Sequence, residues 1–138
     1  MAALTPPTST RVEFLSLVEA VLAWEPQGPG VPDRDTVRDA VDQFTAHGRD
    51  LAAQLRALLG SCPTSSPQVA CARATLREAD WRLPLPPPLA LPQAVLRAQN
   101  LGRLIEALHR AADLIQAEQT GATGRQAHPR ACLPEDFT

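Results

Sequence analysis

The chain has no lysine and no tyrosine, and its only aromatic residues are three phenylalanines and two tryptophans among 138 residues. A core with so few aromatic side chains must be built from leucine, valine and alanine, which favours helices over sheet. Lysine is normally among the commonest residues, but all thirteen basic residues here are arginines. A coding sequence biased toward Arg, Ala, Pro and Gly would explain this, and so would selection against lysine modification. The sequence leaves both explanations open.

An excess of positive charge is also missing, because the net charge is −2 and the pI is about 5.9. Proteins that bind nucleic acid normally carry a basic stripe, so direct nucleic-acid binding is not expected. No apolar run approaches the roughly 18 residues of a membrane span. The N-terminal MAALTPPTST lacks the apolar segment of a signal peptide. We therefore expect a soluble intracellular chain, nuclear or cytoplasmic, with reduced cysteines and no membrane contact.

The residue patterns of familiar catalytic, metal and phosphate-binding sites are absent as well. Eight residues separate Cys62 from Cys71, and Cys132 is far from both, so no C-x-x-C pair exists. No H-x-x-x-H pair is formed by the histidines, His47, His109 and His128. These spacings predict a non-enzymatic chain without a metal, a cofactor or a small-molecule substrate. We expect Cys71 to act as a half-buried apolar residue, and the histidines of the helices to flank a bundle or face solvent.

Prolines and glycines divide the chain into four helical segments. They cluster at residues 26–32, at 60–63 and at 84–92. Thr10 and Glu13 form a T-x-x-E capping box before the first segment, and Asp33 precedes the second. The predicted helices are 11–24, 34–59, 67–82 and 93–119.

These segments predict an all-α fold, either a helical bundle or two paired helical hairpins, with a polyproline joint before the last helix. The helical domain spans residues 10–119. Residues 1–9 read as a flexible polar arm. Residues 120–138 have no periodicity and read as a disordered tail.

The predicted helices 34–59 and 93–119 each carry apolar residues at alternating spacings of four and three, the pattern of a heptad seam. Such a seam either packs against the other seam of the same chain or awaits a helix of another protein. Gly48 lies on the first seam, where it would let another backbone approach closely. The residues predicted to bind a partner are Val41, Phe44, Gly48, Leu51, Leu55, Leu58, Leu101, Ile105, Leu108 and Ile115.

The stretch RLPLPPPLALPQ, residues 82–93, has two interpretations. Alternating proline and leucine favours an extended polyproline helix, which can serve as a stiff joint or as a docking ligand for a proline-recognising domain. Arg82 is misplaced for the usual orientation of such ligands, and the leucines favour burial, so the joint is the preferred interpretation. Trp24 and Trp81, at predicted helix ends, either cap the bundle or anchor a partner. For Trp81 we expect a cap.

The N-terminal half also resembles a known family. The cluster of Phe14, Leu15, Leu17, Val18, Val21 and Leu22 is similar to the opening helix of the small metazoan Mediator subunit nine. Phe44 matches a later phenylalanine of that family, and the run from Ser66 and Pro67 to Leu76, Arg77 and Glu78 resembles its S-P-x…L-R-E run with different internal spacing. The resemblance covers residues 14–78. The proline-rich region of that family precedes its helices, whereas here the prolines interrupt them.

The resemblance implies a non-catalytic helical subunit in the nucleus, engaged in transcription regulation. The residues themselves predict a helical subunit or adaptor of a multiprotein complex that acts by coiled-coil-like packing with other protein subunits. The alternative is a signalling adaptor that presents residues 84–92 as a polyproline ligand.

Overall fold

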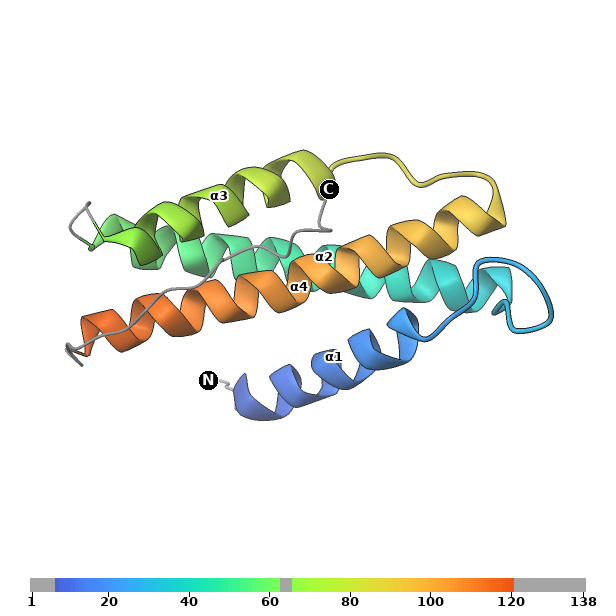
Figure 1. Ribbon diagram of the computed structural model, residues 1–138, viewed down its shortest axis with the longest axis horizontal. Coiled ribbons are helices and arrows are strands. Elements are labelled where there is room, and N and C mark those ends of the chain that lie inside the picture. Colours follow the sequence, from blue (N-terminus) through green and yellow to red (C-terminus); the bar gives the residue numbers. More distant parts are fainter. Residues whose placement is uncertain (1–6, 63–65, 121–138) are drawn as a thin grey trace, which may run out of the picture.

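The computed structural model describes residues 7–62 and 66–120, with side chains from Arg11 onward (Figure 1). All regular structure in these ranges is helical, so the all-α prediction is confirmed. The helices are α1 (Pro7–Leu22), α2 (Arg34–Gly60), α3 (Pro67–Arg82) and α4 (Leu91–Gln119). The predicted disordered tail lies outside the described residues apart from Thr120, as do residues 1–6 of the predicted arm.

Two helix starts differ from the prediction. Helix α1 begins at Pro7, so Thr10 lies inside the helix and the predicted capping box is wrong. Helix α4 begins at Leu91, with Pro92 in its first turn. Proline is tolerated at both starts because the first N–H groups of a helix have no intrahelical acceptor. For α1, the capping box and Pro7 indicate different helix starts, and the helix begins at Pro7.

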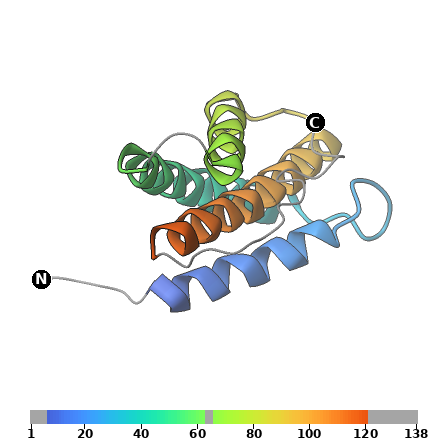
Figure 2. The same ribbon diagram turned by 60° about the vertical axis from the view of Figure 1, so that its left-hand side comes forward.

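Helix α4 occupies the centre of the bundle and packs against the other three helices. Helices α2 and α4 form the largest interface and run in the same direction, whereas α1 and α3 run oppositely and lie on opposite sides of that pair (Figures 1 and 2). Both long connections, the loop at residues 23–33 and the joint at residues 83–90, therefore meet at the same end of the bundle. Of the two arrangements open to the predicted seams, the structure has the one in which the two long helices pack against each other.

The core lies where α2 and α4 meet and consists of aliphatic side chains around one aromatic ring. Its largest members, all less than 2% exposed, include Phe44, Leu55, Leu101, Leu104, Ile105, Leu108 and Ile115. Each fully buried side chain of this size contributes roughly 1.5–3 kcal/mol relative to exposure. The two heptad seams thus bury one another.

Two glycines permit close approaches to the core helices. A Cβ atom on Gly102 would lie 3.3 Å from Val18 Cγ1, so this glycine brings α1 close to α4. A Cβ atom on Gly48 would lie 2.9 Å from Leu83 Cδ2. The expectation that another backbone lies against Gly48 is therefore wrong, because a side chain at the start of the joint fills that space.

Helix α1 is held to α4 partly by polar contacts. Gln99 is buried, and its Nε2 donates to the carbonyl oxygens of Val21 and Trp24 at 3.1 and 3.0 Å. These carbonyls end α1 and need such donors. At the other end of α1, the guanidinium of Arg11 pairs with Asp113 at 2.6 Å. Both ends of α1 are therefore attached to α4.

Candidate functional site

The residues predicted to bind a partner lie inside the bundle and face other helices of the same chain. All of them except Leu58 are buried, and Leu58 is half-buried against the core: Val41, Phe44, Gly48, Leu51, Leu55, Leu58, Leu101, Ile105, Leu108 and Ile115. In this arrangement a partner protein has almost no access to them, although Leu101 also borders a groove beside residues 85–88. Their partner-binding role stays a prediction that requires the helices to separate.

The histidines of α2 and α4 meet between the helices instead of flanking them. His47 Nε2 and His109 Nε2 lie 3.3 Å apart, within hydrogen-bond distance if one ring carries the proton. Phe14 of α1 stacks on His47 with ring centroids 3.8 Å apart. His109 is buried, so the expectation of exposed or flanking histidines is wrong for it. The two residues are far apart in the sequence, and no spacing rule would have paired them.

The surroundings of this pair favour neutral imidazoles. Burial, the positive charge of Arg11 and the neighbouring His47 lower the pKa of His109 to about 4, although Asp113 opposes the shift. Burial likewise lowers the pKa of His47, against the effect of Asp50. Desolvation disfavours the charged form of a histidine. The pair is therefore a neutral polar contact that holds α1, α2 and α4 together near pH 7.

The cysteines also depart from expectation. Cys71 on α3 is half-buried, as predicted, but it is disulfide-bonded. Cys62 is a half-buried free thiol. The expectation that all cysteines are reduced is therefore wrong at Cys71.

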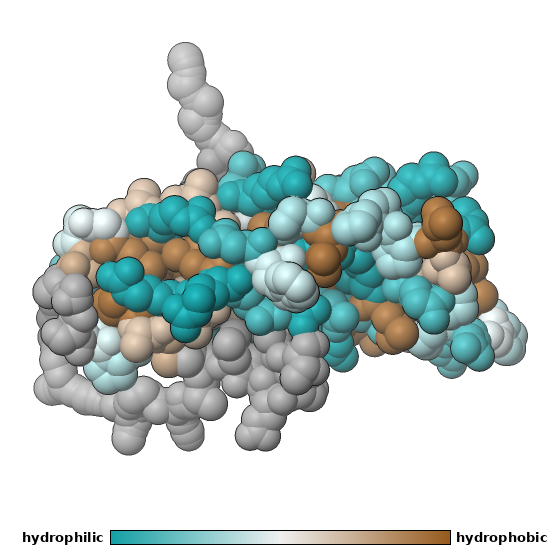
Figure 3. Space-filling model, turned by 90° about the horizontal axis from the view of Figure 1, so that it is seen from above, coloured by the Kyte–Doolittle hydropathy of each residue, from teal (hydrophilic) through white to brown (hydrophobic). Residues whose placement is uncertain are grey.

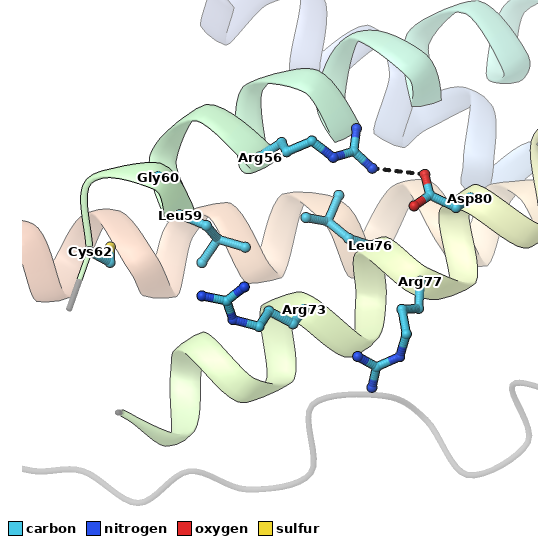
Figure 4. A pocket seen from close by; sticks show the side chains of 8 residues that line it. All are labelled: Arg56, Leu59, Gly60, Cys62, Arg73, Leu76, Arg77 and Asp80. Atoms are coloured by element: carbon cyan, nitrogen blue, oxygen red, sulfur yellow. Dashed lines mark hydrogen bonds and ion pairs between the residues drawn. The ribbon is translucent and has the colours of Figure 1, made fainter. Parts of the chain in front are cut away.

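A positively charged cleft of about 520 Å³ lies between the end of α2 and α3 (Figure 4). Its apolar floor includes Leu59 and Leu76, and Arg56 on one wall pairs with Asp80 at 2.8 Å. Arg73 and Arg77 stand on α3 at its rim, both exposed. The guanidinium of Arg77 extends away from α2 in Figure 4. The arginines therefore do not converge on one point, as a preorganised anion site requires.

The polyproline joint crosses the other end of the bundle and is tied down at two points. Arg97 of α4 donates from Nη2 to the carbonyl oxygen of Leu85 at 2.8 Å. Arg34 of α2 donates from Nη1 to the carbonyl oxygen of Leu89 at 3.0 Å. Leu83, the first residue of the joint, is buried. The structural interpretation as a joint agrees with these contacts.

The leucines of the joint are not all buried, contrary to expectation. Leu85 is 36% exposed and Leu89 is 91% exposed. Trp81 at the end of α3 is 65% exposed, so the predicted cap is wrong, whereas Trp24 packs against the core. Leu96 on the second turn of α4 is 46% exposed. Seen from above in Figure 3, the joint end shows separate apolar groups among polar side chains.

A groove of about 520 Å³ runs between this joint and α4, and we call it the joint groove. Its lining residues are Arg82, Leu85, Pro86, Pro87, Pro88, Gln93, Leu96, Arg97, Asn100 and Leu101. Most of the exposed lining is apolar, with arginine and amide groups between the apolar side chains. This combination is typical of a recognition site with an apolar surface and a few polar groups that fix orientation.

Arg97 is the most unusual residue of the joint groove. Its Nε atom is buried and has no hydrogen-bond acceptor among the described residues. Burial, followed by the nearby charge of Arg82, lowers the pKa of Arg97 from its ordinary value. Buried polar atoms are nearly always hydrogen-bonded. Sequence reasoning missed this residue, because a single arginine on an amphipathic helix carries no signal of burial.

Comparison with known proteins assigns the chain to a family. A family model described as a family of unknown function, DUF6415, matches residues 13–117. The chain belongs to the DUF6415 family. The match spans α2 and α3 and most of α1 and α4, and it lies within the domain predicted at residues 10–119. No curated protein and no solved structure matches this DUF6415 chain.

Neither a metal cluster nor a membrane span is found in the part of this DUF6415 chain that the structure describes. No three of its described His, Cys, Asp and Glu residues are grouped to hold a metal ion. None of the described helices combines the length and the apolar character needed to cross a bilayer. The joint groove is therefore the candidate site with the most specific arrangement of residues.

Proposed function

We propose that this DUF6415 chain is a non-catalytic helical adaptor or complex subunit that binds a partner protein at the joint groove. The proposal keeps the class predicted from the sequence and moves its contact surface. The observation that carries it is the partial exposure of Leu85 and Leu96 along one groove, while the heptad seams are internal. An apolar groove with a few polar groups at its edges is the usual form of a binding site.

The surface has the composition of a binding site for a protein segment. Leu85 and Leu96 form apolar walls, Gln93 and Asn100 supply hydrogen-bonding groups, and Trp81 is exposed nearby at the end of α3. Aromatic and arginine side chains are the residues that most often dominate protein interfaces. An amphipathic helix that lays its apolar face in the groove is the partner geometry we favour.

A second candidate function is presentation of residues 84–92 as a polyproline ligand. The exposure of Leu89 and of Pro84, Pro86 and Pro87 favours it. Against it, the carbonyl oxygens of Leu85 and Leu89 already accept hydrogen bonds from Arg97 and Arg34. A domain that binds polyproline helices uses such carbonyls as acceptors, so docking would first have to release the joint. The groove therefore has the stronger support.

Selection from a library of displayed random peptides tests the proposal. The full chain is immobilised, and bound peptides are collected and resynthesised for affinity measurements. We expect binding to be lost in Leu96→Asp, because the carboxylate would enter the apolar wall of the groove. Leu114→Asp is the matched control, since Leu114 lies on the same helix and is 40% exposed, against 46% for Leu96.

Peptides that bind the wild type and Leu114→Asp equally, and lose affinity for Leu96→Asp, support the proposal. Peptides that bind all three proteins equally contradict it. The same selection also includes proline-recognising domains. If these domains are enriched instead of peptides, and Leu89→Ser removes their binding, the polyproline function replaces the groove function.

A further inference from the structure

We propose that the joint groove is specific for an acidic segment, in which a carboxylate flanked by apolar side chains pairs with Arg97. This inference rests on the proposed function and names the chemistry of the partner. It follows from three features of the groove: an orphaned buried donor, apolar walls on either side of it, and the absence of any acid in the lining.

The first feature is the unsatisfied Nε of Arg97. The side chain is fixed, because its Nη2 donates to the carbonyl oxygen of Leu85 at 2.8 Å. Its Nε, buried and without an acceptor among the described residues, cannot find water as an exposed arginine would. A carboxylate is the acceptor that pairs most strongly with a guanidinium, so a partner's carboxylate at the groove is the contact that would neutralise Arg97.

The second feature is the apolar setting of that guanidinium. Leu85 and Leu96 border the groove and are partly exposed, and Pro86 to Pro88 form its rigid side. Closing this surface with another apolar segment would exclude water. An ion pair gains strength as the surrounding dielectric constant falls. The fitting ligand therefore carries its carboxylate between apolar side chains, as one face of an amphipathic helix does.

The third feature is the charge of the lining. Two arginines, Arg82 and Arg97, border the groove, and none of the residues in its lining is acidic. Arg82 pairs with Glu78 on α3, outside the lining. The lining of the cleft between α2 and α3, by contrast, includes an acid, Asp80, which pairs with Arg56. The groove thus has an uncompensated positive charge in a chain whose net charge is −2, which gives it selectivity for an acidic partner.

The test uses peptides selected on the wild-type chain, each in two versions that differ only by Glu→Gln or Asp→Asn. We expect selected peptides to be enriched in acidic residues next to leucine or phenylalanine. Neutralising the acid, or replacing Arg97→Gln, should weaken binding by about tenfold or more. Arg73→Gln, at an exposed position of α3 outside the groove, is the control for the loss of one positive charge. Its affinity should stay close to that of the wild type.

A charge exchange separates recognition from a structural role of Arg97, which also holds the joint. Arg97→Glu should lose the acidic peptide and bind the version in which the same acid is replaced by lysine. A merely structural role would not restore binding in this way. Equal affinity for the acidic and neutral peptides, together with sensitivity to Leu96→Asp, would overturn the inference and leave the proposed function standing. Insensitivity to Leu96→Asp would remove the proposed function itself.

Discussion

In the interface between α2 and α4, Leu55 and Leu108 are fully shielded from water, whereas Leu85 and Leu89 in the joint are 36% and 91% exposed. Both regions are rich in leucine, but only the first repeats its leucines at helical spacing. A repeat of that kind places apolar residues on one face, and a second repeat in the same chain can cover it. The joint has prolines in place of a repeat, so its leucines have no matching face.

This difference separates the residues that stabilise the fold from those available to bind another molecule. Residues of the α2–α4 interface determine whether the chain folds, and residues of the joint groove are free to contact another molecule. Substitutions in the two regions should therefore have different consequences.

Leu108→Asp should unfold the chain. The carboxylate would be buried among aliphatic side chains without a partner, which costs about 5 kcal/mol, comparable with the whole stability of a small domain. Leu114→Asp on the same helix should change the free energy of unfolding by no more than about 0.5 kcal/mol, because Leu114 is 40% exposed. Thermal melts followed by circular dichroism compare the two. A folded Leu108→Asp would show that the seam is not the core.

Within the segment that joins α3 to α4, Leu83→Ala and Leu89→Ala should differ strongly. Leu83 is 6% exposed and fills the space beside Gly48, so its truncation leaves a cavity and costs about 3 kcal/mol. Leu89 is 91% exposed, and its truncation should leave stability within about 0.5 kcal/mol. Denaturant titration of both variants measures this. Similar losses for both would mean that Leu89 packs against the bundle in solution.

The architecture was largely predictable because its signals are local. Proline and glycine clusters mark the connections, and the alternating spacing marks the two long helices. Whether the seams meet each other or another protein was not predictable, because a heptad repeat describes one face and says nothing of what covers it. The composition of the joint was likewise misleading. Its apolar residues suggested burial, but the joint arches over the end of the bundle, and only Leu83 of its leucines is buried, beside Gly48 of α2.

The candidate site was beyond prediction for a different reason. It depends on contacts between different elements, such as the hydrogen bond from Arg97 to Leu85, and the 3.3 Å contact of His47 with His109 elsewhere in the bundle was missed for the same reason. Charged and imidazole side chains occur on many exposed helix faces, so the residue types alone favour an exposed interpretation. Burial of these groups follows from helix packing that no local pattern records.

The contact between His47 and His109 makes the free energy of unfolding of the chain dependent on pH. The pKa of His109 is about 4 in the folded chain, against roughly 6.5 when unfolded. The unfolded chain therefore binds more protons between these values, so this contribution is present above pH 6.5 and is lost as the pH falls toward 4. We expect the free energy of unfolding to drop by about 2 kcal/mol between pH 7 and pH 4.5.

Denaturant titrations at several pH values measure this dependence, and the variant His109→Phe serves as its control. The variant keeps a ring beside His47 and removes the group with the larger shift, so most of the slope between pH 6.5 and 4.5 should disappear. An unchanged slope would assign the acid sensitivity to carboxylates instead. Binding at the joint groove should be unaffected at pH 6, since His109 is not among the residues of its lining.

The smallest expected effect concerns the residues that precede the first turns of α3 and α2. Ser66 caps α3, because its hydroxyl accepts a hydrogen bond from the N–H of Val69 at 3.1 Å. Ser66→Ala should cost about 1 kcal/mol. Asp33 occupies the same position before α2, but its side chain accepts from the hydroxyl of Thr36 and makes no capping hydrogen bond. Asp33→Ala should therefore cost less than Ser66→Ala in parallel melts. The reverse order would show that Asp33 caps α2 in solution, as its position in the sequence predicts.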